Sequence, residues 1–218
     1  MRKFYLSTLL TLFLTLSLIA PVLASADTPA ISSDVALKML IDGNQRFLTE
    51  KYASAQLGKA RRVELTKGQH PFAVIVSCSD SRVPPEILFD QGLGDLFVVR
   101  VAGNILDPIE LGSVEYAVEH LNAKLIVILG HENCGAVKAT IDGGEVPPNI
   151  GAIAAKIQPA VAAAKAANSA NLYEAATDIN ISNMVAVLKG DPILTHISGI
   201  KIVGAKYHLE SGGIEFIK

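Results

Sequence analysis

Four apolar runs, separated by stretches long enough for helices, limit the fold more than any other feature of this sequence. They are residues 71–77 (PFAVIVS), 95–102 (DLFVVRVA), 124–129 (KLIVIL) and 200–207 (IKIVGAKY). The first two are continuously apolar, which is typical of parallel strands buried on both faces. Between the runs we expect an amphipathic helix over 109–121. Residues 150–189 are rich in alanine and predict helix, with breaks at Pro159 and near 168–171.

This alternation predicts a single α/β domain. Strand–helix–strand units place parallel strands in one sheet with helices on both faces. Residues 211–213 (SGG) then turn the chain into a short last strand over 214–217, which predicts an antiparallel hairpin. An N-terminal helix is expected after Ser33 or Asp34, either of which can cap it. The expected fold is a mostly parallel central sheet of four strands with an antiparallel edge strand, flanked by helices.

The first 26 residues have a different character from the rest. Arg2 and Lys3 precede a leucine-rich run, and residues 24–26 (ASA) form an A-x-A cleavage pattern. This is the pattern of a secretory signal peptide; an uncleaved membrane anchor is the alternative. Cleavage after Ala26 would leave a single domain of residues 27–218 with 17 basic and 21 acidic residues, a net charge of −4. We therefore expect a periplasmic protein, without a membrane segment once the signal is removed.

Composition narrows the function further. The 218 residues include two cysteines and no tryptophan, and the net charge of the whole chain is −2. This balance gives no basic footprint for a nucleic acid. Half of the residues are hydrophobic, which excludes a disordered chain, and two cysteines cannot make a disulfide scaffold.

Both cysteines follow predicted strands. Cys78 directly follows the first run, and His131 and Cys134 follow the third. Ligand sites in open α/β sheets form at the carboxyl ends of strands, where the strand order reverses, so neighbouring strands would bring the three side chains together. Two thiolates and an imidazole suit zinc, and three protein ligands leave the open position of a catalytic site. Two other interpretations remain: inert buried thiols, or a Cys78–Cys134 disulfide.

Asp80 and Arg82 form a second pair close to Cys78. The guanidinium would keep the carboxylate ionised by lowering its pKa, and Asp80 could then accept a hydrogen bond from water at the metal and orient it. An ordinary surface ion pair is the alternative. Asp80 could also take the fourth zinc position itself and close the site.

Three blocks of the sequence resemble a β-class carbonic anhydrase of bacterial, exported form. They are PFAVIVSCSDSRVPPE, GDLFVVRVAGN and GSVEYAVEHLNAKLIVILGHENCGAVKA, and the resemblance runs from about Asp34 to Ile141. It implies one zinc ion per subunit, with Cys78, His131 and Cys134 as ligands. Asp80 and Arg82 would be the catalytic pair, with Asp80 a fourth ligand in a closed form.

The resemblance also implies a reaction and an assembly. The reaction is the reversible hydration of carbon dioxide to bicarbonate and a proton by a zinc-bound hydroxide. The assembly is a homodimer or a dimer of dimers. Two other functions stay open: a related zinc lyase or hydrolase acting on carbon disulfide or carbonyl sulfide, or a non-catalytic zinc or thiol module. Arg100 is expected to be structural, and the histidines outside both motifs are expected to be background, namely His70, His120, His196 and His208.

Overall fold

A five-stranded sheet forms the centre of the computed structural model, which describes residues 31–53 and 56–217. The strands lie in the order β2-β1-β3-β4-β5. They are β1 (Ala73–Ser77), β2 (Leu96–Arg100), β3 (Leu125–His131), β4 (Lys201–Tyr207) and β5 (Ile214–Ile217). The first four are parallel and β5 pairs antiparallel with β4. The predicted fold class is confirmed. The predicted leader, residues 1–26, lies outside the described residues.

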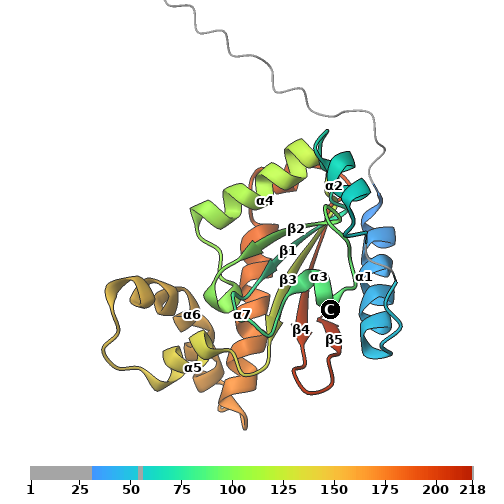
Figure 1. The fold of residues 1–218 in the computed structure, drawn as a ribbon. Coiled ribbons are helices and arrows are strands. Elements are labelled where there is room, and N and C mark those ends of the chain that lie inside the picture. The colour runs from blue at the N-terminus through green and yellow to red at the C-terminus, as the bar shows by residue number, and fades with distance from the viewer. Residues whose placement is uncertain (1–30, 54–55, 218) are drawn as a thin grey trace, which may run out of the picture.

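Helices cover both faces of the sheet (Figure 1). Residues of α1 and α3 pack on one face with alternate residues of β1 and β3, whereas residues of α4 and α7 pack on the other, and α6 packs against α7. The helices are α1 (Ser33–Leu48), α2 (Lys59–Leu65), α3 (Pro85–Leu88), α4 (Pro108–Leu121), α5 (Gly135–Asp142), α6 (Pro148–Ala166) and α7 (Leu172–Lys189). Short 3₁₀ turns are η1 (Ala102–Asn104) and η2 (Leu194–His196).

Three details of the sequence prediction were wrong. β2 is not buried on both faces: it is one of the two edge strands of the sheet, and its apolar side chains are only half-buried. Helix α6 continues through Pro159, and the break comes only after Ala166. Strand β3 extends two residues further than expected, to His131, because its last two residues pair with Lys206 and Tyr207 of β4.

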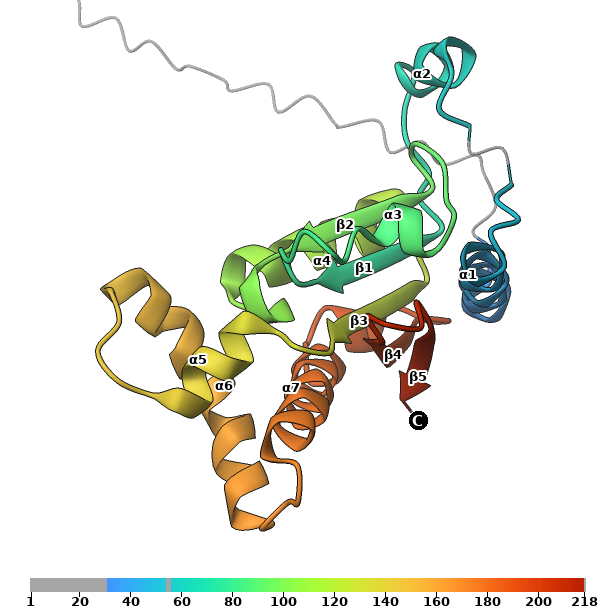
Figure 2. The same cartoon turned by 60° about the horizontal axis from the view of Figure 1, so that its bottom comes forward.

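Two helical regions lie away from the sheet. Helix α2 stands apart from it and buries none of its residues, whereas α5 and α6 extend beyond the end of the strands (Figure 2). In the described part of the chain, no helix combines the length and the apolar character needed to span a bilayer.

Candidate metal centre

The strand order reverses between β1 and β3. From β1 the chain passes to β2 on one side, and it then returns to β3 on the other side of β1. Cys78 directly follows β1, His131 ends β3, and Cys134 is the N-cap of α5. The neighbouring ends of β1 and β3 therefore bring together three residues that are far apart in the sequence, as the prediction required.

The three side chains form a compact buried cluster. The ligand atoms of Cys78, His131 and Cys134 all lie within 4.8 Å of one another, and the three residues are at most 5% exposed. Both cysteines are free. The Nε2 atom of His131 is buried and has no hydrogen-bond partner within residues 31–53 and 56–217. A buried imidazole nitrogen without a partner is costly, and a metal ion would satisfy it. Two sulfurs and one such nitrogen fit zinc.

The pKa values of the two thiols are shifted in opposite directions. The hydrogen bond from Cys134 lowers the pKa of Cys78 to about 4; burial opposes this, and the neighbouring His131 and the amides of Gly103 and Asp80 lower the pKa further. The same thiol–thiol bond raises the pKa of Cys134, and burial raises it further. Of the two thiols, Cys78 therefore gives up its proton more easily. Binding of a divalent cation by both sulfurs would require both as thiolates and would release the remaining thiol protons.

The backbone at Gly103 comes close enough to Cys78 to form a hydrogen bond with its sulfur. Its amide donates to Cys78 Sγ over 3.3 Å, and its carbonyl accepts from Asn180 Nδ2 over 2.9 Å. Its φ of +76° is a conformation that residues with a side chain rarely adopt. A Cβ there would lie 2.7 Å from Cδ1 of Ile157. This position therefore requires glycine.

Asp80 and Arg82 lie beside the cluster and form a bidentate ion pair. Arg82 donates from Nε to Asp80 Oδ1 over 2.9 Å and from Nη2 to Oδ2 over 2.6 Å, and its amide also donates to Oδ1. These hydrogen bonds hold the pKa of Asp80 well below its usual range. Asp80 Oδ2 lies 3.8 Å from Nε2 of His131, so the carboxylate borders the cluster while Arg82 binds it.

Arg100 has a structural role, as expected from the sequence, but its contacts with the site were not predicted. Its Nε donates to the Cys78 carbonyl over 3.0 Å, and its Nη2 donates to the Asp80 carbonyl over 2.6 Å. Arg100 therefore fixes the backbone of the segment that carries both side chains. The signal available in the sequence was its place at the end of the second apolar run, which becomes informative only when β2 is known to lie beside β1.

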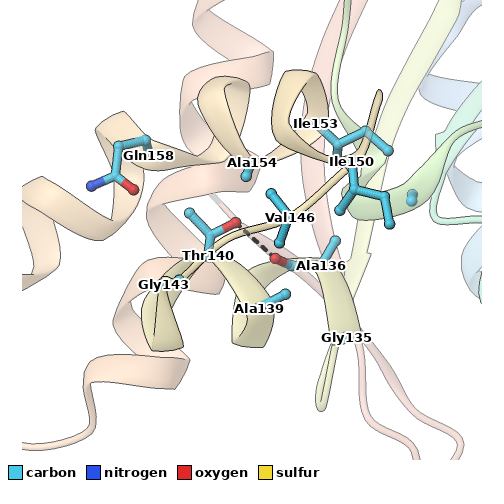
Figure 3. A pocket seen from close by; sticks show the side chains of 12 residues that line it. Gly135, Ala136, Ala139, Thr140, Gly143, Val146, Ile150, Ile153, Ala154 and Gln158 are labelled. Carbon is cyan, nitrogen blue, oxygen red and sulfur yellow. Dashed lines mark hydrogen bonds between the residues drawn. The ribbon is translucent and has the colours of Figure 1, made fainter. Parts of the chain in front are cut away.

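An apolar pocket of about 440 Å³ lies next to this centre, between α5 and α6. Val146, Ile150 and Ile153 gather over Ala136, and the hydroxyl of Thr140 is turned to the carbonyl of Ala136 (Figure 3). The pocket also includes Ala102 and Gly135, which neighbour Gly103 and Cys134 in the sequence. No residue of the pocket was predicted from the sequence.

Comparisons with known proteins agree on one family. The family described as carbonic anhydrase matches residues 73–214. A carbonic anhydrase of Mycolicibacterium smegmatis is 43% identical over 187 residues, covering 83% of this chain and 91% of the relative. Carbonic anhydrase 2 of Mycobacterium tuberculosis is 39% identical over 192 residues, covering 84% and 92%.

Solved structures extend this agreement to the fold. A tetrameric β-carbonic anhydrase of Sordaria macrospora is 26% identical with a TM-score of 0.66, covering 72% of this chain and 85% of that chain. With the sheet, the Cys–His–Cys cluster and these relatives taken together, the chain belongs to the carbonic anhydrase family and is an enzyme of the β class.

Proposed function

We propose that this enzyme hydrates carbon dioxide reversibly to bicarbonate and a proton at a zinc site formed by Cys78, His131 and Cys134. The observation that carries the proposal is the buried cluster itself, in which the ligand atoms lie within 4.8 Å of one another and His131 Nε2 has no hydrogen-bond partner in the described chain. Zinc held there would supply the Lewis acidity that lets water act as a nucleophile near neutral pH.

In this proposal Asp80 orients the water. Its Oδ1 accepts two hydrogen bonds from Arg82, whereas Oδ2 accepts one and lies nearer to His131. An ionised carboxylate has lone pairs to spare, so Oδ2 can accept a hydrogen bond from a water molecule at the cluster. The water then keeps a lone pair for the carbon of carbon dioxide. Formation of the new C–O bond gives bicarbonate, and one proton leaves to solvent.

Arg82 determines where the Asp80 carboxylate points. Its Nη2 also donates to the carbonyl of Asn133 over 3.0 Å, so the guanidinium connects the segment after β1 with the turn before Cys134. Because Arg82 is bound to both segments, it keeps the Asp80 carboxylate turned toward the guanidinium. This arrangement supports an open fourth position, in which Asp80 acts on water, over a closed one in which Asp80 is a ligand.

Stopped-flow hydration of carbon dioxide, with zinc content determined on the same sample, tests the proposal. Fast hydration that disappears with zinc removal and returns with zinc supports it. A fully zinc-loaded protein that is inactive from neutral to alkaline pH would refute it. Assays with carbonyl sulfide and carbon disulfide would then separate another small-molecule lyase or hydrolase from a non-catalytic zinc module.

We also propose that the protein forms a homodimer or a dimer of dimers. The Sordaria macrospora enzymes are tetrameric, and β2 leaves one edge of the sheet open here with half-buried apolar side chains. Open, apolar sheet edges are normally covered. Light scattering after size-exclusion chromatography measures the mass. A monomer at micromolar concentration would contradict the proposal.

Export to the periplasm is the last part of the proposal. It rests on the basic start, apolar run and ASA pattern of residues 1–26. Expression of the full chain in a Gram-negative host, followed by fractionation and N-terminal sequencing, tests it. We expect a periplasmic protein beginning at Asp27, and a cytoplasmic protein beginning at Met1 would contradict the signal peptide.

A further inference from the structure

Among the described residues, one hydrogen bond orients the ring of His131. Its Nδ1 lies 2.7 Å from the carbonyl oxygen of Glu132, and His131 as a whole is fully buried. A carbonyl oxygen only accepts, so Nδ1 must carry the proton in this bond. The position of the Glu132 carbonyl therefore favours the tautomer in which Nε2 carries no proton. Its lone pair can then bind a metal ion together with the two sulfurs.

The side chain of Glu132 fixes the peptide that carries this carbonyl. Its Oε1 accepts from Nδ1 of His208 over 2.6 Å, and its Oε2 accepts from the amide of Leu209 over 3.0 Å. The Glu132 amide donates to the carbonyl of Tyr207 over 3.1 Å. Three bonds thus attach one residue of the metal segment to residues 207–209. The bond from His208 is the shortest, and it joins a carboxylate to an imidazole that can carry positive charge.

The contacts of His208 distinguish it from His196, another histidine outside the two motifs. His196 is exposed, and its Nδ1 contacts the carbonyl of Pro192 within its own turn. His208 instead reaches residue 132, which is 76 positions away in the sequence. Its other nitrogen lies 3.4 Å from Glu215, which is mostly exposed. Of these two carboxylates, Glu132 is the one connected to the metal cluster.

We propose that Glu132 and His208 are positioning residues for the metal centre: their ion pair holds the Glu132 carbonyl where it keeps His131 protonated at Nδ1 and directs Nε2 to Cys78 and Cys134. The proposal rests on the proposed function insofar as it treats His131 as a ligand. Outer partners of metal-binding histidines commonly change metal affinity by about 10–100-fold when removed. His208 acts through one more residue, so we expect the lower end of this range.

The test uses two substitutions at position 208. His208→Phe keeps a planar ring but removes the donor, whereas His208→Asn keeps an N–H near the position of Nδ1. Glu215→Gln and His196→Phe serve as controls, because they change the other partner of His208 and another histidine outside the motifs. Transfer of zinc from each holoenzyme to a chelator is followed. We expect about tenfold faster zinc loss in His208→Phe, recovery of most of that difference in His208→Asn, and wild-type rates in both controls.

A second measurement does not depend on zinc. Nitrogen-15 NMR of the reduced, metal-free protein reports solvent exchange of the His131 Nδ1 proton. We expect slow exchange of this proton in the wild type. In His208→Phe we expect exchange about tenfold faster, the same factor as for zinc loss, because both depend on the position of the Glu132 carbonyl. If His208→Phe does not fold, Glu132→Gln replaces it, with the same direction of change expected in both measurements.

The results separate this inference from the proposed function. Unchanged zinc release together with unchanged proton exchange in a folded His208→Phe protein would overturn the positioning role. Equal effects in His208→Phe and His208→Asn would also overturn it, because the donor would then be irrelevant. A wild type that does not bind zinc would refute the proposed function, while the exchange measurement would still decide whether His208 orients His131.

Discussion

Asp80→Asn separates the orientation of water from the binding of zinc. In the wild type, Arg82 offers three N–H groups to Asp80, two to Oδ1 and one to Oδ2. An asparagine has one oxygen and one NH₂ group. Its oxygen will take the position of Oδ1, where it accepts from two of the three donors, because an NH₂ group there would be repelled by both. The NH₂ group is then placed at the position of Oδ2, 3.8 Å from His131 Nε2 in the wild type.

The substitution therefore replaces an acceptor with a donor at the side of the carboxylate that borders the cluster. A water molecule can no longer donate to this side chain, and positioned proton acceptors of this kind contribute about 10²–10⁴-fold to rates. We expect kcat/KM to fall by at least about 100-fold, equivalent to about 2.7 kcal/mol of transition-state stabilisation. Zinc content should stay at the wild-type level, because the three ligand side chains are unchanged.

Stopped-flow hydration assays at pH 7 to 9, with zinc measured on the same samples, give the answer. Asp42→Asn is the matched control, because Asp42 forms an exposed ion pair with Lys38 on α1. An Asp80→Asn enzyme with full zinc and a wild-type kcat/KM would refute the role assigned to Asp80. Loss of zinc in that variant would instead show that Asp80 contributes to metal binding.

Three further predictions concern the ligands, the acid pH range and the backbone. Replacing Cys78 or Cys134 by serine should abolish both zinc binding and activity; a serine variant with one zinc ion per chain and normal turnover would contradict the ligand set. Because the folded-state pKa of Asp80 is lowered, its contribution to stability is complete above about pH 4 and is lost as the pH falls through the folded pKa. The difference in Tm between the wild type and Asp80→Asn should therefore be constant from pH 5 to 8 and shrink below about pH 4; a difference already lost at pH 6 would be inconsistent with this pairing. Gly103→Ala should destabilise the protein by about 1–3 kcal/mol through its positive φ and the contact with Ile157, lowering Tm by at least about 2 °C. An unchanged melting curve would mean that the turn adjusts without cost.

The sequence predicts the strands well because their apolar runs depend on burial alone. The predictions fail where the structure of a segment depends on its contacts with other segments. Nothing within residues 95–102 says that this strand lies at the edge of the sheet, because that follows from the order of all five strands. Pro159 removes one hydrogen bond from α6, but the packing of Ile157, Ala160 and Val161 in the core compensates for this loss.

In the candidate site, too, some residues could be recognised from the sequence and others only from the fold. Cys78, His131 and Cys134 stand out because thiols and an imidazole are rare at the ends of apolar strands, and Asp80 and Arg82 are close enough in sequence to be read as a pair. Arg100 and His208 could not be recognised in this way. Each acts through a backbone or side chain more than 20 positions away, and only the pairing of β1 with β2 and of β3 with β4 brings it there.

The topology of the sheet also determines when the metal centre can exist. Cys78 lies 53 residues before His131, and β2 and α4 occupy the interval. In the unfolded chain only His131 and Cys134 are near one another, and two ligands hold a metal ion weakly. The full set of donors forms only after β1 and β3 have paired, and such non-local contacts are slow to form. We therefore expect a metal ion to enter a preformed pocket instead of nucleating the fold, and chelation should leave a folded apoprotein that can be reloaded.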